Sequence, residues 1–264
     1  MRLRLLPLLA VVAVARHASA MPVPCPPGMV PLPGAGGACI DRYEASIEVQ
    51  YAAGAPWVRN PFNVPIPTTP SSAPGYPLSP PFPGQFRFRA AATAHGERPQ
   101  AFVSQAVAKA ACAAAGKHLC NATEWNAGCS RDGDAFPYGA TFRPGACNTG
   151  QANPVPVVFG PNAGWTHLEM LHPVLVSLPN TLAGAGTFPN CTTPARGGGD
   201  GGGGTFDQAG NMDEWIDETT SEGHGVFRGG YFVDDVINGA GCAYRTTAHA
   251  PDYNDYSLGF RCCL

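Results

Sequence analysis

Cysteine is the residue type with the most chemical potential in this sequence. Ten cysteines occur, and the last three are Cys242 in GCAYR and the pair that ends GFRCC. A cysteine acts as a nucleophile only as a thiolate in an electropositive setting, and Arg245 and His249 follow Cys242. A disulfide would abolish that reactivity. The first question is therefore whether Cys242 is a reactive thiol or half of a covalent bridge.

The first twenty residues indicate the redox setting of these cysteines. Arg2 and Arg4 precede an apolar run over 5–14, and small residues at 18–20 follow. That order is typical of a secretory signal peptide over residues 1–20, which is too short to span a membrane. All ten cysteines come after it. We therefore expect a secreted or periplasmic protein, in which an even number of cysteines indicates a disulfide framework.

Composition narrows the classes of function. The formal net charge is −3 and no basic cluster occurs, which argues against a nucleic-acid partner. No later apolar run is long enough to predict a membrane span. Charged residues make up only 13% of the chain, whereas glycines number 33 and prolines 28. This balance predicts a loop-rich fold with short elements tied together covalently.

Local patterns predict two helices and a few strands. Apolar residues at helical spacing indicate a helix over 103–114, with Ser104 as its cap. Asn121 and Glu124 form a capping-box pattern that begins a second, shorter helix ending at Cys129. The expected strand-like segments are 25–46, which reads as a hairpin pair, 226–233 and 258–262.

Several phrases then follow one another in a set order along the chain. They are CPPGMVPLPG and CIDRYEAS near the start, and RPQAFVSQAVAKAACAAAGKHLCNATEW, FPYGATFRPGACN, TFDQAGNMDEW, FRGGYF and LGFRC after residue 97. In this order the chain resembles the formylglycine-generating enzyme family, also called sulfatase-modifying factors. The resemblance implies an α+β fold of the variant C-type-lectin-like type, with little regular secondary structure. It covers most of a single domain over 21–264, with loop-rich insertions at 52–90 and 151–204.

The resemblance also implies an activity, from which this chain departs. Family enzymes use oxygen to convert a sulfatase cysteine into formylglycine, and the better understood members hold copper(I) between two cysteines. The matching stretch, YFVDDVINGAG around Phe232 and Ile237, contains no cysteine, and Asp213 stands where the enzymes carry a tryptophan. Copper(I) is soft and needs a thiolate pair, so copper is not expected here.

Two readings of function follow. The first is a binding or structural protein without a catalytic residue, with a protein, peptide or glycan as its partner. The alternative is a formylglycine-generating oxidase whose catalytic thiol is Cys242, alone or with Cys263.

A disulfide pattern comes with the same resemblance. Two family bridges match Cys112 with Cys262 and Cys129 with Cys242. The other six cysteines pair by elimination, as Cys25–Cys39, Cys147–Cys191 and Cys120–Cys263.

TFDQAGNMDEW carries the second candidate chemistry. Family structures bind calcium at the matching loop, and the ligands here would be the side chains of Asp207 and Glu214 and the backbone carbonyls of Gly210 and Met212. Calcium takes about six to eight hard oxygen ligands, and two carboxylates around a tight Gly-Asn turn can supply several of them. The alternative is a capped turn with exposed acids, in which Asp207 acts as a turn former.

Overall fold

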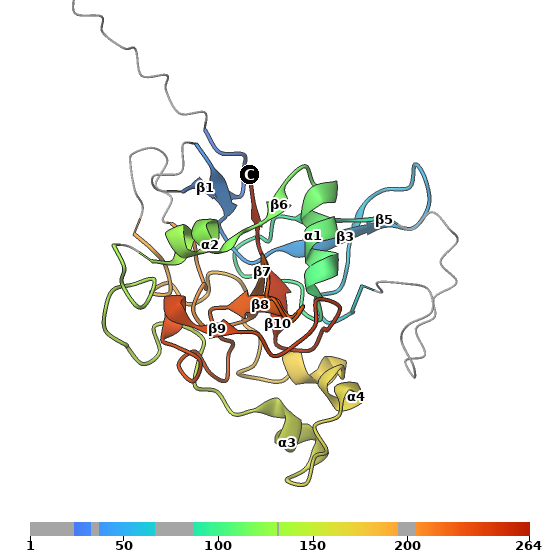
Figure 1. Cartoon of the computed structure of the whole chain (residues 1–264). Helices are drawn as coiled ribbons and strands as arrows, with labels where there is room; N and C mark the ends of the chain where they lie inside the picture. Colours follow the sequence, from blue (N-terminus) through green and yellow to red (C-terminus); the bar gives the residue numbers. More distant parts are fainter. Residues whose placement is uncertain (1–23, 33–36, 67–86, 131, 195–203) are drawn as a thin grey trace, which may run out of the picture.

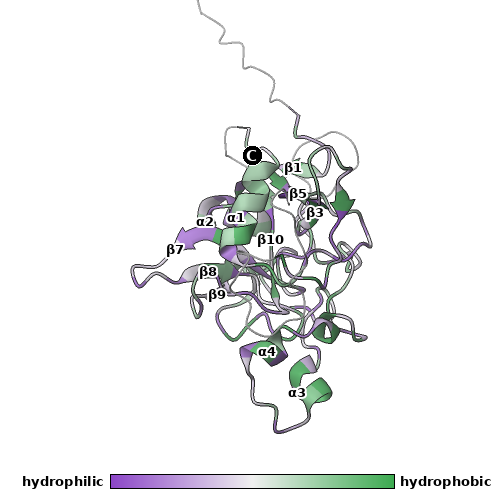
Figure 2. Ribbon diagram, turned by 90° about the vertical axis from the view of Figure 1, so that its right-hand side faces the viewer, coloured by the Kyte–Doolittle hydropathy of each residue, from purple (hydrophilic) through white to green (hydrophobic). Residues whose placement is uncertain are grey.

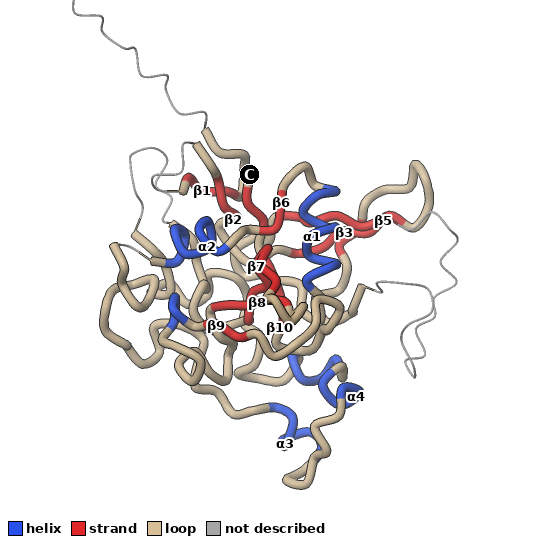
Figure 3. Tube along the Cα trace, viewed as in Figure 1, coloured by secondary structure: helices blue, strands red, loops and turns tan. Residues whose placement is uncertain are grey.

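The computed structural model describes residues 24–32, 37–66, 87–130, 132–194 and 204–264. The expected signal peptide lies outside these residues, as do residues 67–84 of the proline-rich stretch 55–84 and most of the GGGDGGGG run. Within the described ranges, long loops connect short helices and strands (Figure 3). The loop-rich character expected from the composition is therefore present.

The two longest helices are those expected from the sequence. Helix α1 spans Gln105–Ala114, and the Ser104 side chain caps it by accepting a hydrogen bond from a backbone N–H of its first turn. Helix α2 spans Ala122–Cys129, and Asn121 and Glu124 form the capping box at its start. Local sequence therefore determines where both helices begin.

Three small sheets combine segments that are far apart in the sequence (Figure 1). Their strand orders are β1-β2-β11-β6, β10-β7-β8-β9 and β4-β3-β5. The β1–β2 hairpin was expected, whereas the strand expected over 226–233 ends at residue 228. The strands are β1 (Met29–Pro31), β2 (Cys39–Asp41), β3 (Ser46–Gln50), β4 (Val58–Arg59), β5 (Arg87–Ala91), β6 (His118–Leu119), β7 (Asp213–Thr219), β8 (Gly225–Arg228), β9 (Arg245–Thr246), β10 (Leu258–Phe260) and β11 (Cys262–Cys263).

The segment expected to be a loop-rich insertion at 151–204 contains short helices that the sequence analysis did not find. They are α3 (Pro154–Phe159), α4 (His167–Met170) and the 3₁₀ turn η1 (Pro173–Val176). Each begins at a side-chain cap, and in α4 the cap is a Thr166–Glu169 capping box. These elements are only one or two turns long, so they show too few positions for helical periodicity to be visible.

The apolar interior lies between α1 and the second and third sheets. Trp215 on β7 is fully buried, and its indole N–H donates to the Val103 carbonyl at 2.7 Å. Phe227 on β8 packs edge-on against Trp215, with ring centroids 4.9 Å apart. A second apolar cluster surrounds Trp125 of α2. Both clusters position β7, the strand that carries Asp213 and Glu214.

Five disulfides contain all ten cysteines. Two of them fasten the chain end to α1 and to the residue after β6, across sequence separations of 150 and 143 residues. One bridge of that span stabilises a fold by roughly 4–5 kcal/mol on the chain-entropy account, and two that close nearly the same loop do not add. The five pairs match those expected from the sequence: Cys25–Cys39, Cys112–Cys262, Cys120–Cys263, Cys129–Cys242 and Cys147–Cys191.

Gly230 provides a test of the loop packing after β8. Its φ is +74°, and a Cβ there would collide with the Asp234 carbonyl oxygen and the Asp235 backbone. Gly223 has a similar φ of +86° but faces open space. We expect the free energy of unfolding of both alanine variants to fall by roughly 1 kcal/mol, because alanine disfavours the left-handed backbone conformation. In Gly230→Ala it should fall by about 1–3 kcal/mol more, because the new methyl group overpacks the loop. Urea unfolding midpoints measure both losses, and equal losses would contradict this packing.

Candidate functional site

Cys242 lies in a disulfide with Cys129 at the end of α2, and both residues are buried. The backbone N–H of Cys242 donates to the Ala135 carbonyl at 2.8 Å, which holds the disulfide against the loop that contains Ala135. The basic residues that follow Cys242 have other partners. Arg245 forms an ion pair with Glu218 at 2.7 Å, and the ring of His249 stacks on an aromatic side chain. In this fold the sulfur of Cys242 is therefore part of a disulfide and is not a free thiol.

The positions that match the family's catalytic cysteines do not face a common point. The Phe232 side chain is 0% exposed and packs in an apolar cluster, whereas Ile237 is 80% exposed on the surface. A metal held by two ligands needs both side chains to converge. This stretch therefore offers neither the sulfur atoms nor the geometry of a copper pair.

Acidic side chains gather beside this stretch, and the sequence analysis singled out only one of them. Asp213 begins β7 and is buried, and its Oδ1 has no hydrogen-bond partner. Burial raises the pKa of Asp213 well above its ordinary value, and the nearby charges of Asp255 and Asp234 raise it further. Asp235 accepts a hydrogen bond from Thr149 at 2.9 Å, and its other carboxyl oxygen is unpaired. Burial and the neighbouring acids therefore favour the neutral form of the Asp213 carboxyl.

Glu214, the next residue on β7, forms an ion pair with Arg261. The Arg261 Nε and Nη2 atoms donate to the two carboxylate oxygens of Glu214, each at 2.6 Å. The Trp125 indole donates to Glu214 Oε2 at 2.7 Å, and both members of the ion pair are fully buried. A bidentate pair of this kind is the strongest form of carboxylate–guanidinium contact. Both oxygens of Glu214 are therefore already bonded inside the protein.

Two further acids complete this buried group. Asp207 accepts a hydrogen bond from the Gly186 backbone N–H at 2.7 Å, and Glu44 accepts one from the Asn211 side chain at 2.8 Å. The second carboxyl oxygen of Glu44 is unpaired. Burial and the charge of Asp207 raise the pKa of Glu44 well above its ordinary value, and burial raises that of Asp207 to about 7. Three acids around a single arginine are thus partly neutralised by protons.

The family model for the sulfatase-modifying factor enzyme 1-like domain matches residues 82–264, which is more than half of the chain. The chain belongs to this family. No curated protein matches it. The matched region includes Asp207, Asp213, the Glu214–Arg261 ion pair and four of the five disulfides, whereas Glu44 precedes it.

The calcium ligands expected for this sulfatase-modifying factor domain are Asp207, Glu214, Gly210 and Met212. Asp207 and Glu214 are both in the buried group, but as folded the four residues do not fit a calcium ion. Arg261 and the Trp125 indole bond both oxygens of Glu214, and the guanidinium would repel a cation placed there. Across the described ranges, no group of three or more His, Cys, Asp or Glu side chains is arranged to hold a metal.

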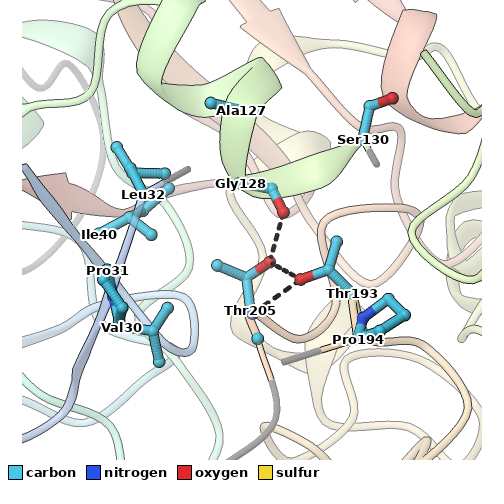
Figure 4. A pocket seen from close by; sticks show the side chains of 11 residues that line it. Val30, Pro31, Leu32, Ile40, Ala127, Gly128, Ser130, Thr193, Pro194 and Thr205 are labelled. Carbon is cyan, nitrogen blue, oxygen red and sulfur yellow. Dashed lines mark hydrogen bonds between the residues drawn. The ribbon is translucent and has the colours of Figure 1, made fainter. Parts of the chain in front are cut away.

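Two hollows lie among the described residues. The smaller, about 30 Å³, lies between the β1–β2 hairpin and the end of α2 (Figure 4). Thr205 Oγ1 donates to the Gly128 carbonyl at its wall, at 2.8 Å. This volume holds about one water molecule, which is too little for a substrate.

The second hollow, about 220 Å³, lies beside the start of α3. None of the residues that line it carries an ionisable side chain, so it favours an uncharged ligand. They are Gln151, Ala152, Pro154, Val157, Leu178, Pro179, Asn180 and Thr181.

The pKa of Asp207 predicts how stability depends on pH. Its value is about 7 in the folded domain and ordinarily 3.8, so between these values the folded state holds a proton that the unfolded state has lost. The free energy of unfolding should therefore fall as pH rises from about 4 to about 7, by up to roughly 1.4 kcal/mol per pH unit.

An Asp207→Asn variant keeps an acceptor for Gly186 and should flatten this slope. Asp252→Asn changes an exposed acid and serves as the control. Chemical unfolding between pH 4 and 8 measures the slopes. Identical slopes for wild type and Asp207→Asn would show that Asp207 is not the titrating group.

Calcium binding at the Asp207–Glu214 loop stays a prediction from the resemblance, and it can be measured directly. Because Arg261 must leave Glu214 before calcium can approach, we expect the same thermal midpoint in EGTA and in millimolar calcium. A ligand present at about 100 times its Kd would stabilise the fold by about 2.7 kcal/mol, which is a readily visible shift. A calcium-dependent rise that Glu214→Gln abolishes would establish the site.

Proposed function

We propose that this sulfatase-modifying factor domain is a binding or structural protein, without the thiol chemistry of the formylglycine-generating oxidases. One observation carries the proposal: all ten cysteines are paired in disulfides, and the chain has no others. Copper(I) binding and thiol oxidation both need a thiolate. A catalytic thiol would appear only if one of these bridges opened.

The proposal places the domain outside the cytoplasm. Five disulfides fit an oxidising compartment, and no helix among the described residues is long and apolar enough to cross a membrane. The expected signal peptide over residues 1–20 supplies the export route. The fold that goes with this role is the variant C-type-lectin-like scaffold, in which loops carry the function.

The partner class follows from the hollow beside α3. Its lining combines the apolar side chains of Pro154, Val157 and Leu178 with the amides of Gln151 and Asn180. Binding sites of this type bury an apolar group and orient it with a few neutral polar groups. A neutral segment of a peptide or a glycan residue has both features, whereas a charged ligand would find no counter-charge. We therefore assign an uncharged peptide or glycan partner to this domain.

The alternative oxidase function makes the opposite prediction about Cys242, so a thiol count separates the two. Wild-type protein unfolded without reductant should show no reactive thiol. Folded wild-type protein supplied with copper(I) and oxygen should not convert the cysteine of a sulfatase-derived peptide. The physical reason is that every sulfur atom is already bonded to another.

A Cys129→Ser variant is the sharper control, because it leaves Cys242 as a free thiol in its native surroundings. We expect it to show one thiol and no conversion, since a single sulfur does not form a copper pair. Two thiols in the wild type, together with copper(I) binding and peptide conversion, would overturn the proposal in favour of the oxidase.

A further inference from the structure

An exposed apolar face lies at one end of the molecule. Helices α3 and α4 project at the end opposite the C-terminus in both views, and α3 is apolar along its length (Figures 1 and 2). Three large apolar side chains are mostly uncovered there: Val157 on α3 is 64% exposed, Trp165 before α4 is 51% and Leu168 on α4 is 58%. A concentration of exposed apolar side chains in one projecting segment marks an interaction site.

One of these residues has an unusual backbone conformation. Trp165 has a φ of +52°, in the left-handed region that bulky residues rarely adopt. Helix α4 begins one residue after the Thr166 cap, so this conformation lies directly at the turn into the helix. Strain that leaves a tryptophan in solvent points to a function for its exposure.

The charge pattern of the segment distinguishes among partners. Residues 144–194 contain no lysine, arginine or aspartate, and their single glutamate is Glu169. Protein interfaces draw much of their specificity from charged groups placed opposite those of the partner, and this segment has almost none to offer. The interfacial region of a lipid bilayer accepts tryptophan and aliphatic side chains, and a neutral bilayer requires no counter-charge. A neutral membrane surface therefore complements this face better than a protein does.

Glu169 is compatible with such a surface because its carboxylate is bonded within its own loop. It accepts hydrogen bonds from the Thr166 backbone N–H at 2.7 Å and hydroxyl at 3.0 Å, and from the Gly164 backbone N–H at 3.3 Å. These bonds replace part of the hydration that the carboxylate would lose near a membrane. The charge can lie at the headgroup level while the neighbouring apolar side chains enter.

We propose that the α3–α4 segment docks on the surface of a neutral phospholipid membrane, with Val157, Trp165 and Leu168 entering the headgroup region. The docking is peripheral and reversible, because only three side chains contribute and no cationic cluster adds attraction to anionic lipid. Val157 also lines the hollow beside α3, so the test substitutes Trp165 and Leu168 and leaves Val157 unchanged. It places an exported domain on a membrane surface without a membrane-spanning helix.

Sedimentation with sucrose-loaded phosphatidylcholine vesicles tests the proposal on the full mature chain. Wild type should bind weakly, and a Trp165→Asn/Leu168→Gln variant should lose about tenfold or more of its partitioning, because both apolar contacts are removed. Asparagine tolerates the left-handed backbone at 165, so this variant should keep its fold. Brominated acyl chains should quench the fluorescence of wild type more than that of the variant.

The matched control is Val236→Gln/Ile237→Gln, which removes two side chains that are 51% and 80% exposed elsewhere on the surface. It should bind vesicles as wild type does, and adding phosphatidylglycerol should not strengthen binding. Three results would each overturn the proposal: no wild-type binding at millimolar lipid, equal loss in both double variants, or binding only to anionic vesicles. Self-association through the same face without vesicle binding would also exclude it.

Discussion

The buried ion pair between Glu214 and Arg261 is the contact on which the rest of this domain depends. It joins β7 to the residue between β10 and β11, and the same guanidinium donates to the carbonyls of Asp41 at 3.0 Å and Phe206 at 2.9 Å. Four segments from the start, middle and end of the chain therefore meet at one side chain. Removing one partner of such a pair typically costs about 3–5 kcal/mol, because the other charge is left buried and unpaired.

The surroundings of this pair explain why the TFDQAGNMDEW loop holds its shape as it does. Asn211 has a φ of +60°, and its amide bridges two places: it donates to Glu44, and its oxygen accepts from Asn148 at 2.9 Å. Asp207, also at a positive φ of 61°, is fixed by the Gly186 backbone. One guanidinium supplies the positive charge beside the loop, and Asp207, Asn211 and Glu214 are hydrogen-bonded within the protein, whereas Gln208 Oε1 and Asp213 Oδ1 have no partner. A divalent cation at Glu214 would have to displace Arg261.

Sequence reasoning succeeded where the information is local or covalent. The capping signals at Ser104 and Asn121 lie within a few residues of the helices that they start, and the cysteine order fixed the bridges once the resemblance was in view. Sequence reasoning could not show that Arg261 would form an ion pair with the carboxylate of Glu214, because that contact joins residues 47 apart and depends on the whole fold. The unpaired oxygens of Asp213 and Asp235 likewise follow only from burial, which no local pattern reports.

The framework of this domain and its segment over 144–194 are built from different residue types. The disulfides and the ion pair immobilise the family framework, and they do so with the residue types that a catalytic site would otherwise use. Asp213 shows the consequence most clearly. Burial and the neighbouring acids raise the pKa of its carboxyl, and a carboxyl oxygen is too hard a ligand to hold copper(I) tightly. The segment over 144–194 has a different composition: Glu169 is its only Asp, Glu, Lys or Arg residue, one disulfide, Cys147–Cys191, closes it, and it bears the exposed side chains of Val157, Trp165 and Leu168. The proposed ligand and membrane contacts both lie on this segment, whereas the buried ion pair and the other four disulfides lie outside it.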